Sequence, residues 1–95
     1  MLSLKDSVLK AIEEYNKYRS PEAKAKPVKI SEKELVLDFE GSFCRTCGVA
    51  DYLEDFIYEL QRLVNVKMRI ESFWEHRRET IRVKYVIEKW RASES

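Results

Sequence analysis

The chain has 95 residues and a mass of 11.4 kDa, the size of a single domain with one hydrophobic core. Hydrophobic residues make up 44% and charged residues 37%, with only two glycines and two prolines, so the composition excludes a disordered or loop-rich chain. Eighteen basic residues against seventeen acidic ones leave a formal net charge of +1. This balance excludes a strong global attraction to nucleic acid or to an anionic membrane.

No stretch of the sequence is apolar over the length of about 20 residues that a membrane span needs. The charged residues Lys5 and Asp6 stand where a signal peptide would have its apolar core. Two cysteines are too few for the disulfide framework of a small secreted protein. We therefore expect a cytoplasmic protein with reduced thiols and no membrane contact. Its high charge and few glycines are also typical of thermophile proteins.

An amphipathic helix is predicted from Leu4 to about Tyr18. Ser3, followed by Asp6, fits an N-cap with an acidic first turn, and Pro21 ends the helix. Apolar side chains recur at spacings of three and four residues, as one helical face requires: Leu4, Val8, Ile12 and Tyr15.

A short hairpin is predicted next. Residues 22–27 read as a polar linker, Val28–Ile30 as a short strand and Ser31–Glu34 as the turn. The second strand, Leu35–Phe39, alternates clearly, with Leu35, Leu37 and Phe39 on one face and Val36 and Asp38 on the other.

A second helix is predicted from Val49 to about Val64, with Asn65 as a left-handed cap at its end. Acidic residues fill its early turns, where the positive end of the helix dipole favours them. Its apolar stripe has helical spacing: Val49, Leu53, Phe56, Ile57, Leu60 and Val64.

The last third predicts a longer hairpin with a polar tip at residues 75–79. Val66, Met68, Ile70, Ser72 and Trp74 should share one face of its first strand, and Ile81, Val83, Tyr85 and Ile87 one face of its second. Val86 and Trp90 should lie on the opposite face of the second strand. We expect Phe73, Trp74, Tyr85 and Trp90 in the core or covering the sheet.

These elements predict one small α+β domain over residues 1–95. Its order is α-β-β-α-β-β, with an antiparallel or mixed sheet and two helices on one face.

The strongest candidate for chemistry is the pair Cys44 and Cys47. Two-residue spacing lets both sulfurs reach one metal ion, or each other. The pair stands between a predicted strand and a predicted helix start, and the positive end of a helix favours the thiolate that binds metal. Gly41 and Gly48 flank the pair and would let the backbone approach a ligand closely. Arg45 adds positive charge, which acidic residues at 51, 54 and 55 oppose.

The number of available ligands constrains how a single chain could bind a metal. A closed zinc site or a [4Fe–4S] cluster takes four ligands, but the chain has two cysteines and one histidine. Two chains meeting at a two-fold axis would supply four thiolates, so the hypothesis predicts a homodimer unless carboxylate, water or a partner protein completes the shell. His76 stands among charged residues on the hairpin tip and is read as a solvated turn residue.

Residues 12–71 resemble the C-terminal domain of NifU-type iron–sulfur scaffold proteins. The resemblance lies in Leu35–Gly41 leading into Cys44 and Cys47, in the helix after them and in the strand at 66–70. It implies an iron–sulfur cluster held by four cysteines of two chains and passed to acceptor proteins. The sequence departs from the family pattern at Gly48, where the family usually has proline, at Gly41, which stands one residue further from the first cysteine, and in the additional strand at about 80–90.

Other interpretations stay open. Zinc could replace the cluster. The chain could be a non-enzymatic interaction domain with structural cysteines, or a small thiol redox protein. No other enzyme motif is present: the sequence has no phosphate-binding glycine loop, no HExxH and no Gly-x-Ser-x-Gly. Basic residues of the last hairpin could bind nucleic acid, but cross-strand ion pairs on a solvated face explain their alternation with glutamates equally well, so nucleic acid is not the expected partner.

Overall fold

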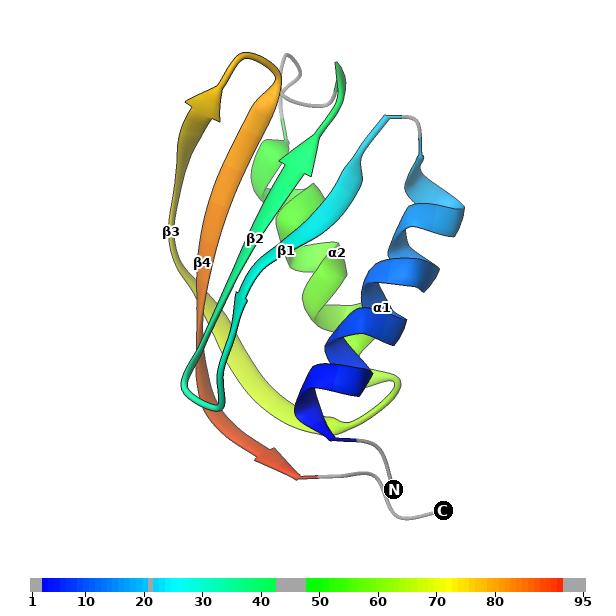
Figure 1. Ribbon diagram of the computed structural model, residues 1–95, viewed down its shortest axis with the longest axis vertical. Coiled ribbons are helices and arrows are strands. Elements are labelled where there is room, and N and C mark those ends of the chain that lie inside the picture. The colour runs from blue at the N-terminus through cyan, green and yellow to red at the C-terminus, as the bar shows by residue number, and fades with distance from the viewer. Residues whose placement is uncertain (1–2, 21, 43–47, 92–95) are drawn as a thin grey trace.

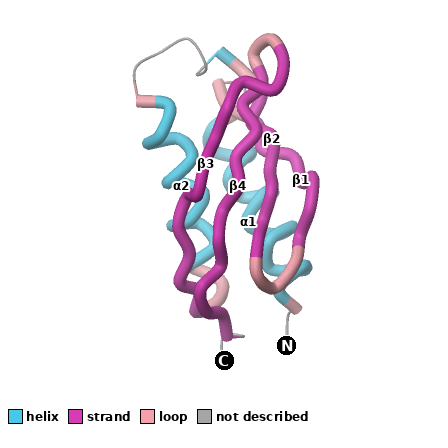
Figure 2. Tube along the Cα trace, turned by 90° about the vertical axis from the view of Figure 1, so that its left-hand side faces the viewer, coloured by secondary structure: helices cyan, strands magenta, loops and turns pink. Residues whose placement is uncertain are grey.

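The computed structural model describes residues 3–20, 22–42 and 48–91, which form two helices and one sheet (Figure 1). The helices are α1 (Leu4–Arg19) and α2 (Val49–Gln61). The strands are β1 (Lys24–Ile30), β2 (Glu34–Glu40), β3 (Asn65–Arg77) and β4 (Thr80–Arg91). This order confirms the predicted α+β class. The four strands pair in the order β1-β2-β4-β3, and every pairing is antiparallel (Figure 2).

Both helices cover the same face of the sheet (Figure 1), as predicted. Burial explains the arrangement, because the alternate residues Leu35, Leu37 and Phe39 of β2 are fully buried beneath the helices. Four aromatic rings fill the centre of this layer, with neighbouring ring centroids 5.4–6.3 Å apart: Tyr15, Phe39, Phe56 and Tyr85. Among the described residues, no helix is long and apolar enough to cross a membrane.

Helix α1 begins as predicted, with the Ser3 hydroxyl accepting a hydrogen bond of 3.1 Å from the Asp6 backbone N–H. The prediction of a polar linker over residues 22–27 was wrong, because β1 already begins at Lys24. Ala25 is almost fully buried opposite Phe39, and the Asn16 side chain bonds to its backbone from α1. Alternating lysines and alanines made this strand look like a linker.

Helix α2 is shorter than predicted and ends at Gln61. The prediction of a left-handed cap at Asn65 was also wrong. Arg62 closes the helix with right-handed geometry, and Asn65 is the first residue of β3. Within the described residues, the only non-glycine residue with positive φ is Glu79, at 58°. Val64 is still buried, as its place in the apolar stripe required.

An additional residue in β3 changes which side chains face the core. Ile70 pairs with Tyr85 but Ser72 pairs with Lys84, so Glu71 forms a β-bulge. Beyond the bulge, Phe73 lies opposite buried Val83 and Trp74 lies on the other face. The predicted single face from Val66 to Trp74 is therefore wrong after Ile70. Phe73 and Trp74 are 43% and 45% exposed rather than part of the core.

A second bulge corrects the prediction for Trp90. Met68 pairs with Ile87 and Lys67 with Lys89, which leaves Glu88 as the additional residue. The bulge returns Trp90 to the helix-covered face, where it packs partly buried against the core. The hairpin tip is also shorter than predicted, because β3 continues to Arg77.

Candidate functional site

The three central residues of the predicted site, Cys44, Arg45 and Cys47, lie outside the described residues. Gly41 and Gly48, which flank them, are described. The chain leaves the described part after Ser42 and returns at Gly48. The end of β2 and the start of α2 lie at the same end of the molecule as the β3–β4 turn (Figure 1).

Gly41 fixes one end of the cysteine segment to the hairpin turn. It follows β2 with φ of +137°, and its backbone N–H donates a 3.1 Å hydrogen bond to the Glu79 carbonyl. Glycine adopts this backbone geometry without the steric cost that a side chain would add. The cysteine segment therefore starts beside the end of the long hairpin.

Gly48 fixes the other end and is the N-cap of α2, with φ of +89° and ψ of 22°. Its carbonyl accepts a 3.0 Å hydrogen bond from the Asp51 N–H, and the helix start has no side-chain cap. A Cβ at position 48 would lie 3.4 Å from Asp51 Oδ2, an ordinary contact. Backbone geometry rather than crowding thus favours glycine here.

The acidic residues near the start of α2 reduce the positive potential of that helix end less than the sequence suggests. Asp55 is held by Arg19 of α1, with 2.8 Å between Asp55 Oδ2 and Arg19 Nη2, so its charge is compensated. Asp51 and Glu54 are exposed to solvent, which screens them. The positive end of α2 therefore remains a favourable place for a thiolate.

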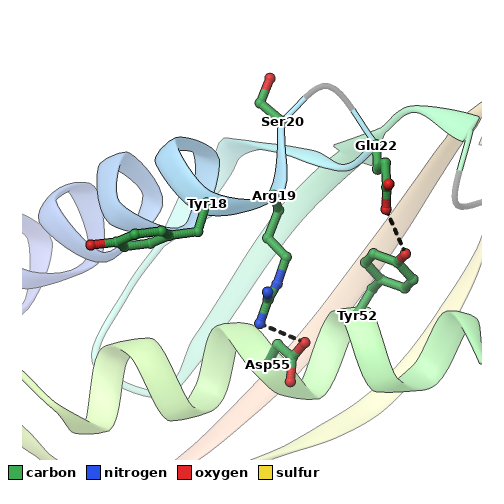
Figure 3. Close-up of a pocket in the computed structure, with 6 residues that line it drawn as sticks. All are labelled: Tyr18, Arg19, Ser20, Glu22, Tyr52 and Asp55. Carbon is green, nitrogen blue, oxygen red and sulfur yellow. Dashed lines mark hydrogen bonds and ion pairs between the residues drawn. The ribbon is translucent and has the colours of Figure 1, made fainter.

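A polar hollow of about 290 Å³ lies between the end of α1 and the start of α2 (Figure 3). The Tyr52 hydroxyl donates a 3.0 Å hydrogen bond to Glu22, which raises the pKa of Tyr52. The Arg19–Asp55 pair crosses the same hollow. Sequence reasoning missed this site. The basic end of α1 and the acidic start of α2 were its only indication.

The polar groups of this hollow bond mainly to one another, which favours a structural role. Tyr15 adds to the same connection, since its hydroxyl donates a 3.0 Å hydrogen bond to the Tyr52 carbonyl. Burial raises the pKa of Tyr15 well above its usual value, so its hydroxyl stays protonated. These contacts hold the end of α1 against the start of α2, next to Gly48.

The charges of the last hairpin had two interpretations, nucleic-acid binding and cross-strand ion pairs. The uncovered face of the sheet carries such ion pairs. Arg82 Nε and Nη2 donate bonds of 2.7 and 3.0 Å to the two Asp38 carboxylate oxygens, which hold the pKa of Asp38 below its usual value. Lys84 lies 3.3 Å from Glu34 and 3.2 Å from Glu71. Asp38 faces away from the helices, as predicted. It is nevertheless nearly buried, with only 6% of its surface exposed.

His76 lies near the end of β3 and is exposed. Within the described ranges, no group of three or more histidine, cysteine, aspartate or glutamate residues is arranged to hold a metal ion.

Comparison with protein-family models, with curated proteins and with solved structures gives no match for this chain.

Proposed function

We propose that this chain binds a metal through Cys44 and Cys47, as an iron–sulfur cluster or, alternatively, as zinc. The supporting observation is the setting of the pair: it follows Gly41 and precedes Gly48, the left-handed glycine that begins α2. The helix start favours the thiolate form that binds metal. A reduced cytosol is the compartment that would keep both thiols available.

The ligand count leads to a homodimer. Two cysteines per chain supply half of the four ligands that a [4Fe–4S] cluster or a closed zinc site needs, and a second copy supplies the rest. The resemblance to NifU-type scaffold domains adds a mechanism to this count. Thiolates of an acceptor protein would displace those of Cys44 and Cys47 one at a time, and the cluster would pass to the acceptor.

The outer edge of β3 is the surface that we assign to the second copy. Phe73 and Trp74 are exposed on this edge strand, and an exposed apolar edge readily pairs with another strand. The opposite edge strand, β1, has Pro27, a bulge at Val28 and three lysines, which are features that prevent such pairing.

Charge selects the register in which two β3 strands would pair antiparallel. With Trp74 on the two-fold axis, Glu71 of one copy lies opposite Arg77 of the other. The symmetry forms this pair of opposite charges two times. With Phe73 on the axis, Glu71 would lie opposite Glu75 and Arg69 opposite Arg77, and like charges directly opposite one another destabilise a sheet. We therefore place the axis at Trp74, close to the turn that carries the Gly41 hydrogen bond.

The test is anaerobic expression with added iron, followed by metal analysis and visible absorbance. We expect a brown protein with about four irons per two chains. Cys44→Ser/Cys47→Ser should lose the iron and the colour, whereas Thr46→Ser, which changes the same segment but keeps both thiols, should retain them. Zinc in place of iron would keep the site and make its role structural.

A wild-type protein without iron or zinc under these conditions would contradict the proposal. Titration with iodoacetamide would then separate the two remaining interpretations. A strongly acidic thiol would indicate a redox protein, and thiols with ordinary pKa values would indicate an interaction domain.

A further inference from the structure

The pairing of charges on the uncovered face of the sheet differs along its length. Across the middle of the face and toward the β3–β4 turn, three cations of β1 and β4 are matched by carboxylates, although Arg69 of β3 is not among them. These pairs are Lys26 with Glu40 at 3.1 Å, Arg82 with Asp38 at 2.7 Å, and Lys84 with Glu34 and Glu71 at 3.3 and 3.2 Å. The end of the hairpin away from the turn has a different composition.

At that other end, Lys67 of β3 lies directly opposite Lys89 of β4, and Arg91 lies opposite Asn65. Like charges in directly opposed positions destabilise a sheet. Within the described part of the chain, none of these three cations lies within 4.0 Å of a carboxylate, and the nearby Glu88 makes no ion pair either. An anion bound between the cations would remove their mutual repulsion.

The same three cations line a hollow of about 530 Å³ together with Asn65 and Trp90. Four other hollows on the molecule measure about 240–290 Å³. The larger volume lies within the range of about 300–1,000 Å³ that small ligands occupy. The lining offers ammonium and guanidinium donors and a side-chain amide, and none of its described residues is a carboxylate.

We propose that this hollow binds a polyphosphate anion, such as the triphosphate group of a nucleotide. Lys67, Lys89 and Arg91 would bind the phosphate oxygens, because lysine and arginine form strong charge-assisted hydrogen bonds to phosphate. Trp90 adjoins the hollow from between Lys89 and Arg91 in β4, so its emission can report an anion bound there. Three cations suit a ligand with several negative charges better than a single carboxylate. The proposal does not depend on the cysteine pair.

Trp90 itself provides the readout. The chain has two tryptophans, so in a Trp74→Phe background all tryptophan emission comes from Trp90. We expect ATP to change this emission in a saturable way, and isothermal titration calorimetry to give the same affinity. Sodium tripolyphosphate should compete with ATP, and the affinity for ATP should fall as sodium chloride rises, because the interaction is electrostatic.

Lys67→Gln/Lys89→Gln should weaken ATP binding by about 30-fold or more, since each charge-assisted hydrogen bond contributes about tenfold or more. The control is Lys17→Gln/Lys24→Gln, which removes two charges from exposed lysines of α1 and β1 and should bind ATP as wild type does. Without ligand, Lys67→Gln/Lys89→Gln should melt no lower than wild type, because it removes a repulsive pair. This measurement separates lost binding from lost folding.

Three results would overturn the proposal. The first is no ATP binding by the wild-type protein. The second is equal loss of binding in the test and control variants. The third is a single-stranded oligonucleotide of about twelve nucleotides that binds more than 100-fold tighter than ATP, which would make this surface a nucleic-acid site.

Discussion

Asp38 is a nearly buried carboxylate held by one guanidinium. Asp38→Asn should lower the free energy of unfolding by about 2 kcal/mol at pH 7, because it removes a charge-assisted bidentate pair. The pKa of Asp38 is lower in the folded protein than its usual value. Its stabilising contribution is therefore present above the unfolded pKa, about 3.9, and is lost as the pH falls through the folded pKa.

Urea unfolding of both proteins between pH 7 and pH 2 checks this prediction. The difference in free energy between wild type and variant should shrink toward the acid end. Glu40→Gln is the matched control, since it removes the more exposed Lys26–Glu40 pair and should cost less than about 1 kcal/mol. A constant difference across this pH range would show that Asp38 does not act through its charge.

Substitutions of Gly48 test the role of the left-handed backbone at the start of α2. Gly48→Ala should destabilise the protein by about 1 kcal/mol or more, because alanine is strained at φ of +89°. Gly48→Asn should cost less, since asparagine tolerates the left-handed region better. Thermal unfolding of the three proteins gives the order, and equal losses for alanine and asparagine would mean that the cost is steric rather than conformational.

At the scale of single elements, Asn16 connects α1 to the edge strand β1. Its side-chain amide donates a 3.0 Å hydrogen bond to the Ala25 carbonyl, and its oxygen accepts a 2.7 Å bond from the Ala25 N–H. Asn16→Ala should cost about 2–3 kcal/mol, because it leaves both backbone groups of an almost fully buried residue without partners.

Hydrogen exchange followed by NMR shows where Asn16→Ala destabilises the protein and by how much. The Ala25 amide should exchange faster in Asn16→Ala, while amides of β4 should change only with global stability. Asn65→Ala, at an exposed position, is the control. Unchanged protection of Ala25 would show that its bonds to Asn16 do not hold the edge strand.

Most elements could be predicted from the sequence because their apolar spacing is regular. Leu35, Leu37 and Phe39 alternate, and Leu53, Phe56, Ile57 and Leu60 follow a helical period. The failures lie where tertiary structure adds or removes one residue. The bulges at Glu71 and Glu88 exchange the two faces of a strand, and no residue type in either place marks them. The first four residues of β1 were missed because their burial depends on Asn16, which lies eight residues before the strand.

The candidate site was only partly predictable. Spacing and the flanking glycines identified the pair Cys44 and Cys47, which lies outside the described residues, and the structure shows Gly48 as the N-cap of α2. The hollow between α1 and α2 could not be found from the sequence. Its residues Arg19, Tyr52 and Asp55 become neighbours only when the two helices pack together.

At the scale of the whole molecule, the β3 edge makes a prediction about assembly. Arg77→Glu should weaken the proposed homodimer, because it places like charges opposite one another across the axis at Trp74. The exchange Glu71→Arg/Arg77→Glu should restore it, although Lys84 then keeps only its pair with Glu34. Analytical ultracentrifugation measures both dissociation constants. A dimer that is equally strong in all three proteins would place the interface elsewhere.

Native mass spectrometry of anaerobically iron-loaded protein tests most directly whether two chains share one metal site through four thiolates. One spectrum reports both the number of chains and the mass of bound metal and sulfide. We predict a species of two chains with one [4Fe–4S] cluster, or with zinc in the alternative, and metal-free single chains for Cys44→Ser/Cys47→Ser. A wild-type spectrum of metal-free chains, or metal retained in the double variant, would contradict the account.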